Sequence, residues 1–226
     1  MPEHRFPACL DDCEDAARAL LTDPAYRGHR FVVAGMSAGG YLAIQTSLQL
    51  AQSGLRCDAH VAIAPMVGPF AHFYSVPKNW WLSLFPPRSI LWAWSHFLRG
   101  TEPHTWDWRV SALLATDEQL SKTSPGIVTF HKFDTLRDEA AACAHSTTAS
   151  SGPALSFLLR PCSHTSPPRS RVSGRLCISS RYAKRLAAVG RLHAACELPF
   201  PHGSAVGMHT IMEAVAERLE ARLASG

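Results

Sequence analysis

Long hydrophobic runs are missing from this sequence of 226 residues. The longest candidate, residues 80–98, is interrupted by Pro86, Pro87 and Arg88, so no stretch reaches the roughly 18 apolar residues that a membrane-spanning helix needs. The N-terminus also shows no charged segment followed by an apolar one, and we expect neither a secretion leader nor a transmembrane segment. A hydrophobic content of 46% is ample for a globular core.

Paired-cysteine motifs are missing as well. The seven cysteines are scattered along the chain, and none forms a Cys-x-x-Cys pair. Cys9 and Cys13 stand four residues apart on a predicted helix, where two small buried side chains are a better interpretation than a metal pair. We therefore expect free thiols, a reducing compartment, a cytoplasmic location, and neither a metal nor an organic cofactor.

Acidic residues are absent from a long segment that begins at Ala140. Residues 140–181 contain five arginines, ten serines and four prolines but no lysine, Asp or Glu, whereas the whole chain has a formal charge of +4. This composition is typical of disorder, and no other part of the chain combines basic and aromatic residues as a nucleic-acid partner would require. We interpret residues 141–180 as a disordered insertion from a retained intron or a faulty gene model, with a regulatory basic loop as the alternative.

Removing the insertion joins two halves of one amphipathic helix, because five apolar side chains then share a helical stripe. These residues are Leu136, Ala140, Tyr182, Ala183 and Leu186.

Strands and helices alternate along the remaining chain. Four apolar runs predict buried strands, over residues 29–34, 59–65, 125–131 and 192–198. Helices are predicted over residues 10–21, 41–50 and 205–223. The apolar side of the first helix consists of Leu10, Ala17, Leu20 and Leu21. The alternation predicts one α/β domain with a mostly parallel sheet flanked by helices, in which functional groups follow the C-terminal ends of the strands.

A glycine-rich hexapeptide, Gly35-Met36-Ser37-Ala38-Gly39-Gly40, lies between the first predicted strand and the helix that follows. A strand, a G-x-S-x-G turn and a helix together lift one serine hydroxyl clear of a sheet, and the residues around the serine must be small. Ser37 is then a nucleophile at a helix N-terminus, where the Ala38 N–H can face a developing oxyanion. The alternative is a glycine-serine turn that merely caps a helix.

Two further residues complete a catalytic set in chain order. Asp134 follows the third predicted strand and His202 the fourth, which matches the order Ser, Asp, His of α/β-hydrolases. An imidazole must take the serine proton, and a carboxylate must orient the imidazole and stabilise its charged form. Asp134 can also be a helix N-cap, with Asp138 as the alternative acid; His202 can be a surface histidine, with His209 as the alternative base.

All six tryptophans fall between residues 67 and 108. Large rigid aromatic side chains cover apolar substrates well, so this segment is either a lid or cap that lines an acyl pocket or a second helical layer on the sheet. A lid that contacts a membrane surface is a third possibility with less support.

Several motifs resemble those of the hormone-sensitive-lipase-like α/β-hydrolases, the fold-3 carboxylesterases. Residues 2–12 resemble PEHxFPAxLDD, residues 35–40 the GDSAGG elbow, residues 133–139 FDxLRDE, residues 182–190 YAxRLxxxG, and residues 202–203 the final HG. The resemblance runs in order over most of the chain apart from the insertion. It implies an α/β-hydrolase fold, with Ser37 as nucleophile, Asp134 as acid, His202 as base, and ester hydrolysis through an acyl-enzyme.

The chain also departs from this family in two further ways. His-Gly-Gly occurs nowhere in the 226 residues, although the family has an HGGG oxyanion motif upstream of PEHxFPA. We therefore expect a chain that is incomplete at its N-terminus, lacking the first strands of the sheet and some oxyanion donors, each worth about 10²–10³ in rate. Met36 replaces the family's usual Asp, which leaves the nucleophile in place.

These observations predict a serine hydrolase that cleaves small or medium uncharged carboxylic esters, with a small-molecule ester as its partner. A lactone or amide hydrolase with the same catalytic residues is one alternative. A catalytically impaired protein that acts as a binding module is the other, because an oxyanion loop is missing. The sequence does not indicate an oligomeric state.

Overall fold

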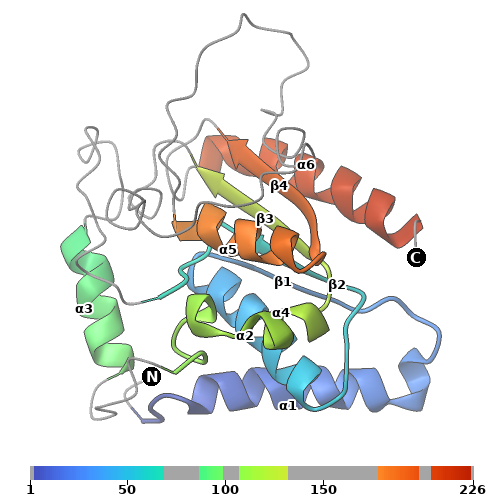
Figure 1. Ribbon diagram of the computed structural model, residues 1–226, viewed down its shortest axis with the longest axis horizontal. Helices are drawn as coiled ribbons and strands as arrows, with labels where there is room; N and C mark the ends of the chain where they lie inside the picture. Colours follow the sequence, from blue (N-terminus) through green and yellow to red (C-terminus); the bar gives the residue numbers. More distant parts are fainter. Residues whose placement is uncertain (1–2, 69–86, 99–106, 132–177, 199–204, 225–226) are drawn as a thin grey trace, which may run out of the picture.

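The computed structural model describes residues 3–68, 87–98, 107–131, 178–198 and 205–224, and every structural statement below concerns these residues. The strands are β1 (Val32–Met36), β2 (Ala59–Ile63), β3 (Gly126–His131) and β4 (Leu192–Leu198). The α-helices are α1 (Ala8–Thr22), α2 (Ala38–Gln52), α3 (Pro87–Phe97), α4 (Asp117–Lys122), α5 (Ile178–Ala188) and α6 (Ala205–Ala224). Figure 1 shows the helices arranged around a sheet.

The four strands form a parallel sheet in the order β1-β2-β3-β4. A parallel neighbour is reached only by a crossover connection, and α2 provides the crossover between β1 and β2. The predicted alternation of strands and helices is thus confirmed. Because the strands are parallel, the chain leaves all four of them at the same edge of the sheet.

Strand β1 differs from its prediction in position and in burial. It spans Val32–Met36 instead of residues 29–34, because the ladder with β2 continues until Met36 pairs with Ile63. We expected a buried strand, but Ala34 and Met36 are exposed and the other three residues are half-buried. Within the described residues, β1 pairs with β2 alone. An apolar run does not distinguish such an edge position from a central one.

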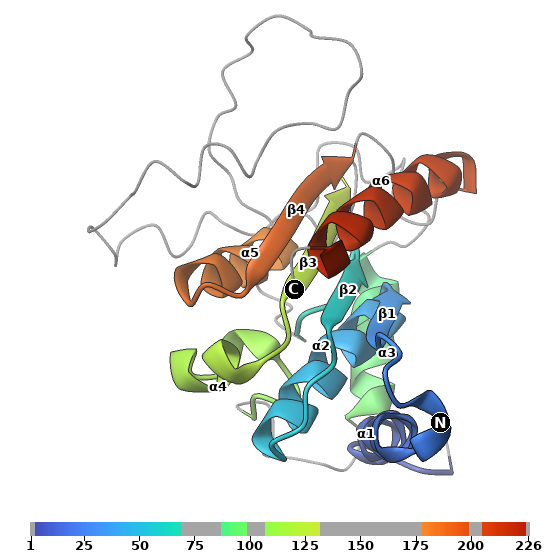
Figure 2. The same cartoon turned by 90° about the vertical axis from the view of Figure 1, so that its right-hand side faces the viewer.

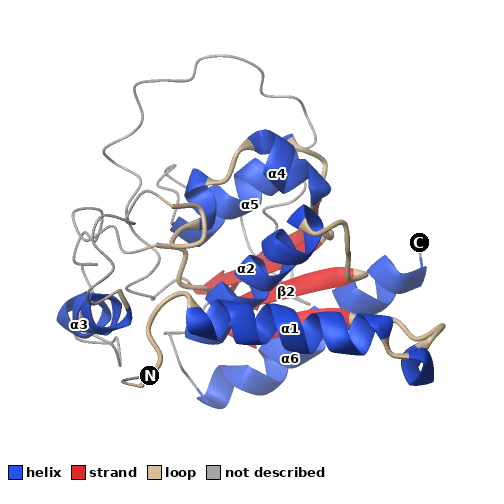
Figure 3. Cartoon of the chain, turned by 90° about the horizontal axis from the view of Figure 1, so that it is seen from below, coloured by secondary structure: helices blue, strands red, loops and turns tan. Residues whose placement is uncertain are grey.

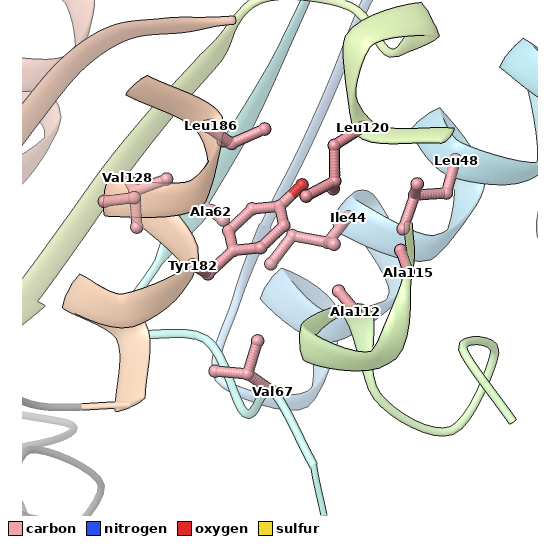
Figure 4. Close-up of a cluster of buried hydrophobic side chains, with 11 residues drawn as sticks. Ile44, Leu48, Ala62, Val67, Ala112, Ala115, Leu120, Val128, Tyr182 and Leu186 are labelled. Carbon is pink, nitrogen blue, oxygen red and sulfur yellow. The ribbon is translucent and has the colours of Figure 1, made fainter. Parts of the chain in front are cut away.

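Helices α2 and α5 cover one face of the sheet, with α2 over β1 and β2 and α5 over β3 and β4 (Figures 1 and 2). Figure 4 shows their interface, in which Tyr182 of α5 lies beside Ile44 of α2 and Leu120 of α4. All three side chains are fully buried. Full burial of an Ile or Leu side chain stabilises a fold by about 1.5–3 kcal/mol. Tyr182, Ala183 and Leu186 are buried together, as the predicted helical stripe requires.

Helix α6 lies on the opposite face of the sheet (Figure 2). Its Val215 packs with Val61 and Ile63 of β2 and with Ile127 of β3. Ala62, between the two β2 residues, belongs instead to the cluster under α2 and α5, as the alternation of side chains along a strand requires. The sheet is therefore covered on both faces, as predicted.

Helix α1 packs against α2 (Figure 3). Leu10 and Ala17 are buried as predicted, but Leu20 is 42% exposed, contrary to its place on the predicted apolar side. Helix α1 packs mainly against α2, so only part of its surface is covered. Cys9 and Cys13 are half-buried free thiols.

Several expectations concern residues outside the described ranges. The insertion predicted at 141–180 lies outside them except for residues 178–180, which belong to α5. The described residues hold no cluster of three or more His, Cys, Asp or Glu side chains suited to a metal ion. Among the described helices, none combines the length and the apolar character needed to cross a bilayer.

Candidate active site

Ser37 occupies the single position between β1 and α2, with backbone angles φ 56° and ψ −117°. A positive φ is unfavourable for a residue with a Cβ and costs about 1–3 kcal/mol, so the surroundings must hold it. The Ser37 N–H donates a hydrogen bond to the Ile63 carbonyl (2.9 Å), and the Ser37 carbonyl accepts from the N–H groups of Tyr41 (3.1 Å) and Met66 (3.2 Å). The turn is thereby tied both to the end of β2 and to the first turn of α2.

Two glycines allow the sharp turn around Ser37. A Cβ on Gly35 would lie 2.1 Å from the carbonyl oxygen of Gly39, and a Cβ on Gly40 would lie 3.0 Å from Pro65. Gly39 itself has no heavy atom within 4 Å of its Cβ position. Gly35 and Gly40 are therefore needed for close backbone approach, whereas Gly39 leaves open space at the start of α2.

A second strained residue, Ala64, lies directly after β2. Its φ is 42°, it is 1% exposed, and its N–H donates to the Thr129 carbonyl at 2.9 Å. Ala64 precedes the Pro65 that contacts the Gly40 position, so it supports the elbow from the neighbouring strand. Strained backbone of this kind concentrates at functional sites. The sequence carries no signal for Ala64, because alanine does not favour the left-handed region.

The N-terminus of α2 provides donors beside Ser37. The first N–H groups of a helix have no acceptor within the helix, and its dipole places partial positive charge there. Ala38 is the first residue of α2, so its N–H is one of these groups. This arrangement can stabilise negative charge that develops on an atom bonded to Ser37.

A cavity of about 430 Å³ adjoins the elbow. Its volume lies in the range of about 300–1,000 Å³ that is typical of small-molecule sites. Helix α3, which lies near the N-terminal end of α1 in Figures 1 and 3, supplies half of its wall. The lining residues are Cys9, Ala38, Tyr41, Leu42, Met66, Trp92, Ala93, Trp94, His96 and Phe97. Because Ala38 belongs to this wall, an apolar group in the cavity lies next to the elbow.

Two polar residues of the cavity wall, Tyr41 and Cys9, are weakly reactive at neutral pH. The Tyr41 hydroxyl donates to the Arg109 carbonyl at 2.5 Å, and burial raises the pKa of Tyr41. Burial also raises the pKa of the Cys9 thiol to about 11, so its sulfur stays protonated and is a poor nucleophile. The described lining residues include no Asp, Glu, Lys or Arg. The cavity therefore suits an uncharged ligand.

The described tryptophans have two kinds of surroundings. Trp94 is buried and packs edge-to-face against Tyr41 at 5.3 Å between ring centroids, and Trp92 is 64% exposed and stacks on His96. Both line the cavity, whereas Trp108 packs against the core cluster under α2 and α5. Trp80, Trp81 and Trp106 lie outside the described residues, so a lid or cap over residues 67–108 stays a prediction.

The other two predicted catalytic residues, Asp134 and His202, also lie outside the described residues. Strand β3 ends at His131 and β4 at Leu198, so both residues follow strands that end at the same edge of the sheet as β1. The alternative acid, Asp138, is not described either. The side chain of the alternative base, His209, is not described, although its backbone belongs to α6.

A different serine–histidine contact lies at the opposite end of the strands. His60 is the second residue of β2 and pairs with Gly126 at the start of β3, far along the strands from Ser37. Its Nδ1 is 3.1 Å from the Ser124 carbonyl oxygen, and its Nε2 is 3.4 Å from the Tyr182 hydroxyl. A carbonyl only accepts, so Nδ1 carries the proton and Nε2 accepts from Tyr182.

This buried network is structural, because no substrate can reach it. His60 is 0% exposed and Ser124 is 1% exposed. The Ser124 hydroxyl is 2.7 Å from the Ser47 hydroxyl and also accepts from the Cys57 thiol. Burial lowers the pKa of His60 to about 4, which keeps the imidazole neutral in the folded protein. We did not single out His60 from the sequence, although a histidine inside an apolar strand was the available signal.

His60 is expected to make the fold less stable in acid. Above pH 6.5 the imidazole of His60 is neutral in both the folded and the unfolded chain. Below pH 6.5 it binds a proton in the unfolded chain, whereas in the folded chain it stays neutral down to about pH 4. Each pH unit between the two pKa values is worth about 1.4 kcal/mol, so the free energy of unfolding should fall by about 3 kcal/mol between pH 7 and pH 4. Urea unfolding at both values measures this.

The matched variant for this test is His60→Gln, which keeps hydrogen-bonding groups but does not titrate. It should be less stable than the parent chain at pH 7 but lose less stability on acidification. Equal losses in the two chains would contradict the assignment to His60.

The chain is similar to known esterases in sequence and in fold. A family model described as the α/β hydrolase fold matches residues 1–165. The arylesterase of Saccharolobus solfataricus is 30% identical over 162 residues, which cover 69% of this chain and 51% of that protein. A fungal esterase from Rhizomucor miehei has a similar structure, with a TM-score of 0.69 and 18% identity, covering 100% of this chain and 63% of that one.

Brefeldin A esterase, described as a bacterial homologue of human hormone-sensitive lipase, matches with a TM-score of 0.60 and 20% identity, over 98% of this chain and 52% of its own. In all three matches the chain spans less than two thirds of the relative's length. The family model nevertheless covers well over half of the chain. The protein therefore belongs to the α/β-hydrolase fold family, which confirms the family that its motifs indicated.

Proposed function

We propose that this protein hydrolyses carboxylic esters, with Ser37 as the nucleophile. The observation that carries the proposal is the strained position of Ser37 between β1 and α2, next to the N-terminus of α2 and an apolar cavity. Three backbone hydrogen bonds hold Ser37 in this strained conformation, and strained backbone concentrates at functional sites. The esterase activity of the named relatives supports the same function.

The proposed reaction has two steps that share one base. The Ser37 hydroxyl attacks the ester carbonyl while His202 takes its proton, and Asp134 orients His202 and stabilises its charged form. The Ala38 N–H stabilises the carbonyl oxygen as it becomes negative. The C–O bond to the alcohol breaks, the alcohol takes the proton from His202, and the acyl group stays on Ser37. A water activated by His202 then cleaves the acyl-enzyme.

The cavity limits the proposed substrate to uncharged esters with an apolar group. A charged group would lose its hydration there without gaining a counter-charge from the wall. An apolar group of small or medium size gains by burial against Leu42, Met66 and Phe97.

The direct test is hydrolysis of p-nitrophenyl butyrate by the purified chain, with circular dichroism to establish that it is folded. Turnover supports the proposal. A folded chain that neither turns over this ester nor reacts with a fluorophosphonate would refute it, leaving a binding module of the same fold. Reaction with p-nitrophenyl butyramide or a lactone, but not with the ester, would identify an amide or lactone hydrolase.

Paired variants test the proposed acid and base. Asp134→Asn and His202→Asn should each lower kcat for p-nitrophenyl butyrate by about 10³-fold or more, because the imidazole would lose its orientation or be absent. The matched changes Asp138→Asn and His209→Asn should leave kcat nearly unchanged. If either matched variant loses as much activity as its partner, the role passes to Asp138 or His209.

A further inference from the structure

The carbonyl of Ser37 receives a hydrogen bond from an irregular position on the neighbouring segment. In a parallel ladder, a residue that donates to one carbonyl of the next strand accepts from the N–H two residues further along that strand. The Ser37 N–H donates to the Ile63 carbonyl at 2.9 Å, so residue 65 would be the regular donor. Residue 65 is a proline, which has no N–H. The bond comes instead from Met66, at 3.2 Å, so the segment after β2 holds one residue more than the ladder needs, as in a β-bulge.

The extra residue accounts for the strained backbone of Ala64. Pro65 favours extended backbone at the residue before it, yet Ala64 has a φ of 42°. A positive φ at the first residue is typical of one kind of β-bulge, in which that residue is usually glycine. The N–H of Ala64 donates to Thr129 on β3 at 2.9 Å. The next N–H along the chain, that of Met66, donates to Ser37 directly after β1, so the chain turns from one neighbouring strand to the other within two residues.

Pro65 also contacts the helix that follows Ser37. A Cβ on Gly40, in the first turn of α2, would lie 3.0 Å from both the Cα and the Cβ of Pro65. The pyrrolidine ring fixes the φ of Pro65 at about −65°, so this contact and the bond from Met66 are held at a set spacing. Met66 in turn lines the cavity beside the elbow. Pro65 thus joins three parts of the candidate active site: the turn, the start of α2 and the cavity wall.

We propose that Pro65 is a positioning residue for Ser37, and that it acts through its missing N–H. The inference rests on the proposed function, because it concerns how the nucleophile of that reaction is held. An N–H at position 65 would offer the Ser37 carbonyl its regular partner, and the bond from Met66 would no longer fix the turn. The Ser37 hydroxyl would then lose its set orientation, and small displacements at a catalytic group slow a reaction strongly.

Pro65→Ala tests the proposal, because it restores an N–H at position 65 and keeps a small side chain. We expect kcat for p-nitrophenyl butyrate to fall about tenfold to a hundredfold. The midpoint of urea unfolding should not fall, because the strain relieved at Ala64 offsets the greater freedom of the unfolded chain. A proline that only stiffens the chain would give the opposite pattern, a lower midpoint with an unchanged kcat.

Amide hydrogen exchange, followed by NMR, gives a readout that does not depend on catalysis. In Pro65→Ala, protection should pass from the Met66 amide to the new amide at position 65. An unchanged kcat in this variant, or a Met66 amide that stays protected, would overturn the proposal. If the parent chain hydrolyses no ester, transfer of protection to position 65 would support the positioning of Ser37 by Pro65 while refuting the proposed function.

Pro24→Ala is the matched control. Pro24 is exposed and opens the short helical turn Pro24–Tyr26, before β1. Its replacement should leave both kcat and the exchange of the Met66 amide unchanged.

Ala64→Gly is the second test, for use if Pro65→Ala does not fold. Glycine adopts a positive φ without strain, so the irregular bond from Met66 would be kept at a lower cost. This variant should keep a kcat close to that of the parent chain and raise the midpoint of urea unfolding. A lower midpoint, or loss of protection at the Met66 amide, would overturn the proposal.

Discussion

Replacing Ser37 by alanine is expected to lower kcat for p-nitrophenyl butyrate by about 10⁴–10⁶-fold, which is the usual loss when a catalytic serine is removed. The hydroxyl is the only part of the residue that changes, and the turn is held by backbone groups that alanine also has. The variant should therefore fold like the parent chain. Steady-state kinetics with matched circular dichroism spectra measures both expectations.

Ser53→Ala is the appropriate control for this variant. Ser53 is the C-cap residue of α2, and its hydroxyl donates to the Glu14 carboxylate at 2.8 Å, at the far end of the helix from the elbow. Its loss should leave kcat close to that of the parent. A Ser37→Ala chain with undiminished turnover would show that another group attacks the ester. A fluorophosphonate adduct mapped by mass spectrometry to Ser37 gives an independent readout.

Gly35→Ala is expected to damage both the fold and the activity. The new Cβ would lie 2.1 Å from the carbonyl oxygen and 2.3 Å from the carbonyl carbon of Gly39, so the first turn of α2 must move away from β1. Overpacking of this kind costs about 1–3 kcal/mol, and here the obstacle is backbone, which yields less than a side chain. We expect a loss of about 3 kcal/mol in urea unfolding and at least a hundredfold loss of kcat, since each small displacement at a catalytic group is costly.

Gly39→Ala provides the matched comparison four residues along the chain. No heavy atom lies within 4 Å of its Cβ position, and it belongs to the first turn of a helix, where alanine is favoured over glycine by about 0.5–1 kcal/mol. This variant should be as stable as the parent chain or slightly more stable. Equal destabilisation by the two substitutions would mean that the turn does not have the geometry described above.

The turn around Ser37 illustrates which structural features a local sequence motif can predict. The need for small residues around Ser37 follows from the motif, and the structure shows contacts that require Gly35 and Gly40. The motif does not separate these from Gly39, because the distinction depends on the folded turn. The obstacle at Gly35 is the Gly39 carbonyl, and the obstacle at Gly40 is Pro65, which follows β2. The strained backbone of Ala64 could not be predicted for the same reason, because it is held by a hydrogen bond to Thr129 on another strand.

Burial was predicted less well than the elements themselves. The period of side chains along a strand or helix indicates which face is apolar, and this sufficed for Leu10, Tyr182 and Leu186. This periodicity did not reveal that Leu20 of α1 and the residues Ala34 and Met36 of β1 are exposed. The burial of a helix or strand depends on which other elements pack against it, and those elements come from distant parts of the chain.

By itself, the sequence determined the parallel α/β architecture, the family and the strand–turn–helix that carries Ser37, because these depend on periodicity and on short motifs that act locally. Only the tertiary structure decided the backbone strain at Ser37, the neutral His60 in its buried network, and the apolar cavity beside the elbow. The physical reason is that each of these is a property of surroundings, formed when segments far apart in the chain exclude water from the same polar groups.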